Sequence, residues 1–78
     1  MTRRIRDLRR MLKTVAGDFG ASVTLEMTHG QHLRATFMVG NRRGCVIASA
    51  TPSDRWFADQ KTKADARRLL RELTQVSP

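Results

Sequence analysis

The stretch "SVTLEMTHGQHLRATFMV", residues 22–39, contains two runs of alternating apolar and polar residues. Side chains of a strand alternate between its two faces, so each run predicts a strand with one apolar face. We expect strands over Ala21–Met27 and His32–Val39, joined by a turn at Thr28–Gln31. The polar side of the second strand would carry His32, Arg34, Thr36 and Met38.

A third strand is predicted downstream of this pair. Gly40–Gly44 has glycine at both ends and reads as a hairpin loop. Cys45–Ala50 is apolar on both faces, which suits a short strand partly covered by helices. The sheet should end at Thr51–Asp54, because Pro52 has no N–H to donate to a ladder.

Helical spacing of apolar residues precedes the strands. Ile5, Leu8, Leu12 and Val15 predict a helix over Thr2–Ala16, with Thr2 as the N-cap and Gly17 as the stop. The opposite face of this helix is rich in arginine.

The segment "KTKADARRLLRELTQ", residues 61–75, predicts the last helix. Thr62 followed by Asp65 resembles a capping box, which places the helix start there. Before it, Ser53 or Asp54 could cap a separate short helical turn that holds Trp56 and Phe57.

These elements form one domain, residues 1–78, with the order α-β-β-β-α. We expect an α+β fold in which two helices cover one face of a three-stranded antiparallel sheet. The other face would be open to solvent or to a ligand. The predicted core is Ile5, Leu8, Leu12, Val15, Val23, Leu25, Phe37, Ile47 or Val46, Leu69, Leu70 and Leu73.

Charge is the strongest signal in the composition. The chain has 15 Lys and Arg against 7 Asp and Glu, a net charge of +8. Most of these cations are arginine, which binds phosphate through two parallel hydrogen bonds. The balance favours a polyanionic partner, nucleic acid or an acidic protein. The competing interpretation is a basic surface that only prevents aggregation.

Other classes of protein are disfavoured. Cys45 is the single cysteine, so no intramolecular disulfide is expected, and two histidines with one thiol make a structural zinc site improbable. No apolar run reaches the length that spans a membrane, and the arginine-rich N-terminus lacks the apolar core of a signal peptide. We therefore expect a cytoplasmic protein without metal or cofactor.

His32 is the candidate catalytic residue. It should share the open sheet face with Arg34, so an imidazole would stand beside a guanidinium. A histidine can move a proton to or from a ribose phosphate at neutral pH, and an arginine can stabilise the charge that develops. A histidine at the start of a strand is also often without function. His29 is an ordinary turn residue or a second proton carrier.

The chain resembles the HicA family, the mRNA-cleaving toxins of HicA–HicB toxin–antitoxin systems, and within it the HicA-like proteins of bacteriophages. "GQHLRATF", residues 30–37, is similar to the Gly-Ser-His-His-type turn of that family, with Gln31 at the serine and Leu33 at the second histidine. "VIASATPSD" and "KTKADARRLLREL" resemble its following strand and closing helix. The resemblance implies a double-stranded-RNA-binding-like fold and a location in the cytoplasm of a bacterial host cell.

The same resemblance implies a metal-independent endoribonuclease with His32 as the catalytic histidine and an acidic, HicB-like antitoxin as partner. Double-stranded-RNA-binding domains use the first helix, a loop and the start of the last helix. Basic residues occur at comparable places in this chain. The predicted RNA-binding set is Arg3, Arg6, Arg10, Arg34, Arg42, Arg43, Lys61 and Lys63.

Three functions stay open from the sequence. The first is an endoribonuclease of HicA type, and the second is a nucleic-acid-binding module without catalysis. The third is a phage protein that binds an acidic host factor, with Trp56 and Phe57 as its anchors. In the alternative interpretation these two aromatic residues only plug the sheet edge.

Overall fold

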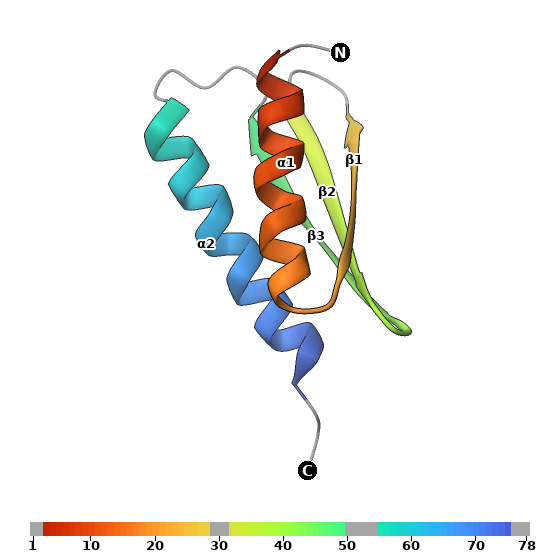
Figure 1. Cartoon of the computed structure of the whole chain (residues 1–78). Coiled ribbons are helices and arrows are strands. Elements are labelled where there is room, and N and C mark those ends of the chain that lie inside the picture. The colour runs from red at the N-terminus through yellow and green to blue at the C-terminus, as the bar shows by residue number, and fades with distance from the viewer. Residues whose placement is uncertain (1–2, 29–31, 50–54, 76–78) are drawn as a thin grey trace.

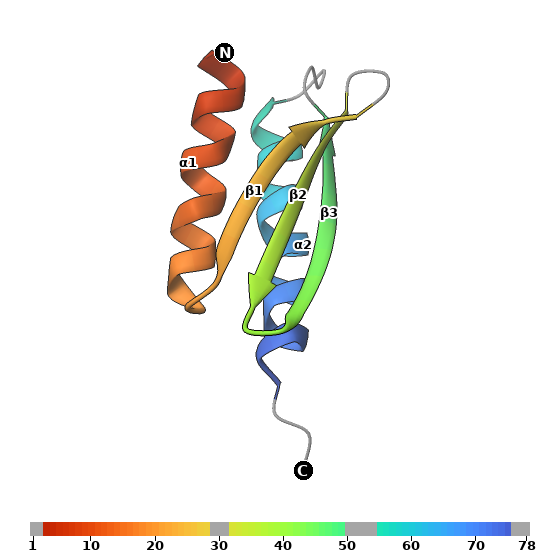
Figure 2. The same ribbon diagram turned by 90° about the vertical axis from the view of Figure 1, so that its right-hand side faces the viewer.

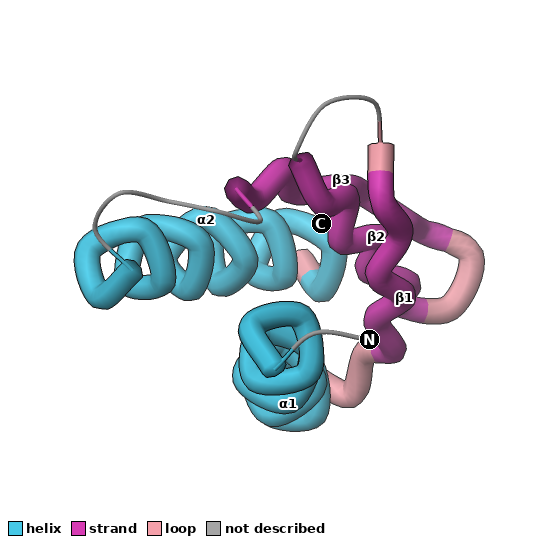
Figure 3. The backbone as a smooth tube through the Cα atoms, turned by 90° about the horizontal axis from the view of Figure 1, so that it is seen from above, coloured by secondary structure: helices cyan, strands magenta, loops and turns pink. Residues whose placement is uncertain are grey.

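The computed structural model of the chain describes residues 3–28, 32–49 and 55–75. The elements follow in the order α1 (Arg3–Asp18), β1 (Ser22–Met27), β2 (His32–Val39), β3 (Arg42–Ser49) and α2 (Arg55–Thr74). The three strands form one antiparallel sheet in the order β1-β2-β3 (Figure 2). α1 packs against β1 and α2 against β3 and β2, so both helices lie on one side of the sheet (Figures 1 and 3). The predicted α+β fold is confirmed.

The predicted alternation in β2 decides which side chains are buried. Leu33, Ala35 and Phe37 are buried under the helices, whereas His32 and Arg34 are exposed on the other face. A fully buried Leu or Phe side chain contributes about 1.5–3 kcal/mol relative to exposure. The complete core is Leu8, Leu12, Val15, Ala16, Leu33, Ala35, Phe37, Val46, Ala48, Ala66, Leu70 and Leu73.

The predicted core differs from this set at its margin. Ile5, Val23, Leu25 and Leu69 are only partly buried against the core, because they lie at its edge. Of Val46 and Ile47, which the sequence left as alternatives, Val46 is the core residue. Its side chain is 8% exposed and that of Ile47 is 55% exposed. β3 is therefore covered by a helix on one face only, although the strand is apolar on both faces.

The β2–β3 connection is shorter than predicted. Val39 pairs with Arg42, so only Gly40 and Asn41 form the turn. Gly40 has φ of 60° and Asn41 has a negative φ, as in a type II′ turn with glycine first. The prediction of a loop over Gly40–Gly44 was wrong.

Gly44 has a packing role in place of the predicted turn role. It lies within β3, where it pairs with Phe37 of β2. A Cβ at this position would come within 2.5 Å of Leu69 Cδ1, so the absence of a side chain lets α2 approach the strand.

The first helix ends later than predicted. It passes through Gly17 and stops at Asp18, and Gly20 follows with φ of 66°. The amide of Ala21 donates to the carbonyl of Ala16 at 2.9 Å, and that of Gly20 donates to Gly17 at 3.2 Å. These two bonds define a Schellman motif with Gly20 in the left-handed position. Gly20, and not Gly17, is the stop. The predicted cap Thr2 lies outside the described residues.

The last helix begins earlier than predicted. It is continuous over Arg55–Thr74, so Trp56 and Phe57 belong to its first turns and not to a separate element. Thr62 lies inside the helix and is 6% exposed, and Asp65 pairs with Lys61 at 3.1 Å. The predicted capping box was therefore wrong. Ser53 and Asp54 lie outside the described residues.

An ion pair joins three elements near one end of the sheet. Arg4 Nη1 of α1 pairs with Asp59 Oδ1 of α2, and Arg4 Nη2 lies 3.4 Å from the carbonyl oxygen of Ser49 in β3. The side chains of Arg4 and Asp59 are 12% and 29% exposed. Arg4 thus links α1, α2 and β3 and is not available as a surface cation.

Candidate nucleic-acid interface

One face of α1 is strongly basic. Residues three and four apart lie on the same side of a helix, which groups Arg3, Arg6, Arg10 and Lys13. All four are exposed, whereas Arg9 is half-buried. A shallow hollow of about 400 Å³ is lined by Arg6, Arg9, Arg10, Lys13 and Thr14. The part of α1 that faces away from the sheet therefore offers closely spaced donors for an anion.

A groove lies between the two helices and continues this surface. Its volume is about 430 Å³. Its lining residues are Asp7, Arg10, Met11, Thr14, Val15, Asp18, Lys63 and Arg67. Arg10 comes from α1 and the other two cations from α2, so residues far apart in the sequence meet here. The two carboxylates come from α1 alone, and Asp7 is 3.9 Å from Arg3 Nε.

Lys61 and Lys63, predicted together, lie on different sides of α2. Lys63 lines the groove with α1. Lys61 is hydrogen-bonded to Asp65, which lines a second pocket on the β3 side of the helix. Two residues along a helix correspond to a rotation of about 200°, so they cannot share a face.

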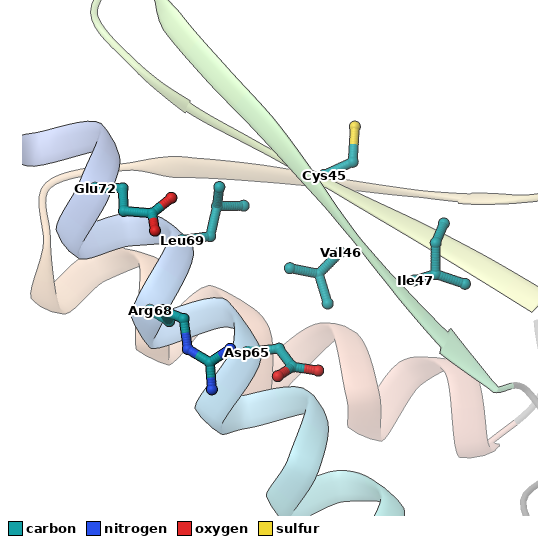
Figure 4. Close-up of a pocket in the computed structure, with 7 residues that line it drawn as sticks. All are labelled: Cys45, Val46, Ile47, Asp65, Arg68, Leu69 and Glu72. Atoms are coloured by element: carbon teal, nitrogen blue, oxygen red, sulfur yellow. The ribbon is translucent and has the colours of Figure 1, made fainter.

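The second pocket lies between β3 and α2 and has a volume of about 310 Å³ (Figure 4). Figure 4 shows Val46 directed toward α2, whereas Cys45 and Ile47 point away from it. Two carboxylates, Asp65 and Glu72, accompany one cation, Arg68, in its lining. This balance is less suited to a polyanion than the groove between the helices.

The structure separates Arg42 from Arg43. Arg42 Nη1 donates to the carbonyl oxygens of Leu73 at 3.1 Å and Gln75 at 2.8 Å. The last carbonyls of a helix have no partner within the helix, so Arg42 caps the C-terminal end of α2. Arg43 lies on the open sheet face opposite Met38. The hairpin is thus beside the end of α2 and not beside its start (Figure 1).

His32 lies at the beginning of β2 on the open sheet face, as predicted. It is exposed, and its cross-strand neighbour is Ser49. Arg34 is on the same face, but its Nη1 is 3.4 Å from Glu26 Oε1, so its charge is shared with a carboxylate. His29, Gly30 and Gln31 lie outside the described residues.

His32 is nevertheless near the amino-terminal end of α1. The pair partner of His32 is Ser49, and the carbonyl of Ser49 accepts the contact from Arg4. The open face therefore supplies one exposed imidazole and the guanidinium of Arg34, which is paired with Glu26.

Trp56 and Arg67 are site candidates that the sequence analysis did not place in the RNA-binding set. Within α2, residues 56, 60, 63 and 67 follow the spacing of a single helical face. Trp56, 71% exposed, therefore lies on the same face as the groove residues Lys63 and Arg67. This spacing was visible in the sequence, but the helix was predicted to start only at residue 61.

Comparisons with known proteins add no assignment. No protein-family model matches the chain, and neither curated proteins nor solved structures give a match. Within residues 3–28, 32–49 and 55–75, no three His, Cys, Asp or Glu residues are grouped so that they could hold a metal ion. Neither of the two described helices is long and apolar enough to cross a membrane.

Proposed function

We propose that this protein binds RNA through the basic surface of α1 and the adjoining face of α2. The observation that carries the proposal is the groove in which Arg10 of α1 meets Lys63 and Arg67 of α2. Arg3, Arg6 and Lys13 extend the positive surface along α1. Cations spaced over such a surface bind phosphates and release counterions.

The element order supports RNA as the polyanion. The α-β-β-β-α arrangement with helices on one sheet face is the fold that the HicA resemblance implies. Such folds present helices to RNA and leave one face of the sheet open. In this chain the helical side carries the concentrated positive charge, while the open face pairs Arg34 with Glu26.

The experiment is a titration of a fluorescein-labelled RNA with the full chain, followed by anisotropy at several salt concentrations. We expect binding that weakens steeply with salt, with a log–log slope of about −0.7 for each phosphate contacted in a single strand. Absence of binding at low salt would overturn the proposal. If the chain binds an acidic protein and does not bind RNA, the result would favour the host-factor alternative.

A second candidate function is metal-independent RNA cleavage at His32. The observation that favours it is the exposed position of His32 on the open sheet face, which also carries Arg34. An imidazole there could take the proton of a ribose 2′-hydroxyl as its oxygen bonds to phosphorus, and return the proton to the 5′-oxygen as the P–O5′ bond breaks, while Arg34 stabilises the phosphate charge.

The cleavage test compares wild type with His32→Ala on cellular RNA in the presence of a chelator. Cleavage by the wild type and none by the variant, with equal RNA binding, supports the nuclease. If both proteins bind RNA and neither cuts it, the chain is an RNA-binding module. Equal cleavage by both proteins would remove His32 from the mechanism.

A further inference from the structure

We propose that the groove between α1 and α2 takes single-stranded RNA, with one unpaired base stacked on Trp56. The inference rests on the proposed function and names the form of RNA that the groove accepts. It comes from the position of Trp56 relative to the groove cations.

The first step is the exposure of Trp56. Tryptophan is a large apolar side chain that is usually mostly buried, yet 71% of this one is exposed at the first turn of α2. Its burial therefore contributes little to the fold. A flat, exposed indole offers a surface on which any base can stack.

The second step is the alignment of Trp56 with the cations. Residues 56, 63 and 67 differ by seven and four positions, which brings them to one face of α2. At 1.5 Å per residue, about 10 Å separates Trp56 from Lys63 along the helix axis, and Arg67 is about 6 Å further. The line runs from an aromatic platform into a groove with phosphate-binding side chains.

The third step is the charge along the groove. Lys63 and Arg67 form the α2 wall and Arg10 adds a cation from α1, whereas the carboxylates Asp7 and Asp18 belong to the α1 wall. A phosphate chain should therefore follow the α2 wall, which leads to Trp56. Aromatic platforms combined with a positive groove are the common design of proteins that bind single strands.

Phe57 provides a matched comparison. It is 64% exposed and immediately follows Trp56. One residue corresponds to a rotation of about 100° around the helix, so Phe57 does not lie on the line with Lys63 and Arg67. A general effect of exposed aromatic residues would involve both positions, whereas stacking of a base on the helix face that continues the groove involves Trp56 alone.

The chain has one tryptophan, so its intrinsic fluorescence reports on Trp56. The experiment titrates the wild type with a labelled oligouridine and with an RNA duplex of the same number of nucleotides. We expect quenching of Trp56 emission by oligouridine, in parallel with the anisotropy change, and little quenching by the duplex. In anisotropy, Trp56→Ala should weaken oligouridine binding about tenfold or more. Trp56→Phe should recover most of the affinity, and Phe57→Ala should bind like the wild type.

The inference would be overturned by oligouridine binding without quenching, or by wild-type affinity of Trp56→Ala. Tighter binding of the duplex than of oligouridine would also overturn it. Each of these results leaves RNA binding itself intact. Failure of the wild type to bind either RNA would instead refute the proposed function, so the two failures can be told apart.

Discussion

Lys63 of α2 and Arg10 of α1 line the same groove, so cations from opposite parts of the chain face one space. Neither helix alone forms this surface. It arises because the two helices cover the same face of the sheet and contact each other. RNA binding should therefore depend on the groove and not on the total positive charge.

Lys63→Ala should weaken binding of unrelated RNA sequences by a similar factor and lower the salt slope by about 0.7, because one phosphate contact to a single strand is lost. The measurement is anisotropy over a range of salt. Lys61→Ala is the control, since Lys61 lies toward Asp65 on the other side of α2. An equal loss for both variants would mean that only net charge matters.

Arg42→Ala should lower the free energy of unfolding by about 1 kcal/mol, because the carbonyls of Leu73 and Gln75 lose a charged donor. Urea denaturation followed by circular dichroism measures this change. The neighbour Arg43 lies on the open sheet face, so Arg43→Ala should change stability by less than about 0.5 kcal/mol. Indistinguishable variants would argue against a role of Arg42 at the helix end.

Asp59→Ala should destabilise the protein by about 2 kcal/mol, since the poorly exposed guanidinium of Arg4 loses its ionic partner. The matched variant is Asp65→Ala, which breaks a pair with a lysine that is 72% exposed. Its cost should be at most about 0.5 kcal/mol. Thermal and urea unfolding of both proteins provide the comparison, and a larger effect at Asp65 would be inconsistent with the structure.

Val46→Ala should cost about 2 kcal/mol, whereas Ile47→Ala should cost less than about 0.5 kcal/mol although isoleucine is the larger side chain. The reason is that Val46 packs under α2 while Ile47 is on the open face. Unfolding free energies from urea denaturation test the order. The reverse order would mean that the helices cover the sheet face that carries Ile47, in contradiction to the structure.

Much of the fold could be predicted from local patterns. The alternation in residues 32–39 gave the bounds and the buried face of β2, because a period of two has few other causes. The glycine stop after α1 could not be assigned to one position. Gly17 was predicted, but both Gly17 and Gly20 permit a left-handed residue, and the structure has that conformation at Gly20.

The start of α2 could not be predicted because polar residues continue its buried side. Asp59 is half-buried in the pair with Arg4, and Thr62 is buried without being apolar. Followed toward the amino terminus, the hydrophobic pattern therefore ends at Ala66, and Thr62 is taken for a helix cap. Because the helix was predicted to start at residue 61, Trp56 was not placed on one helical face with Lys63 and Arg67. The groove between the two helices was found only in the structure.

The most direct test removes three groove cations and compares the product with an equally charged control. Arg10→Ala, Lys63→Ala and Arg67→Ala form the groove variant, and Arg43→Ala, Lys61→Ala and Arg68→Ala form the control. Anisotropy with labelled oligouridine measures the salt slope of each. The groove variant should lose about 2 units of slope, at about 0.7 per contact, while the control keeps the wild-type slope. Equal slopes for the two variants would contradict it.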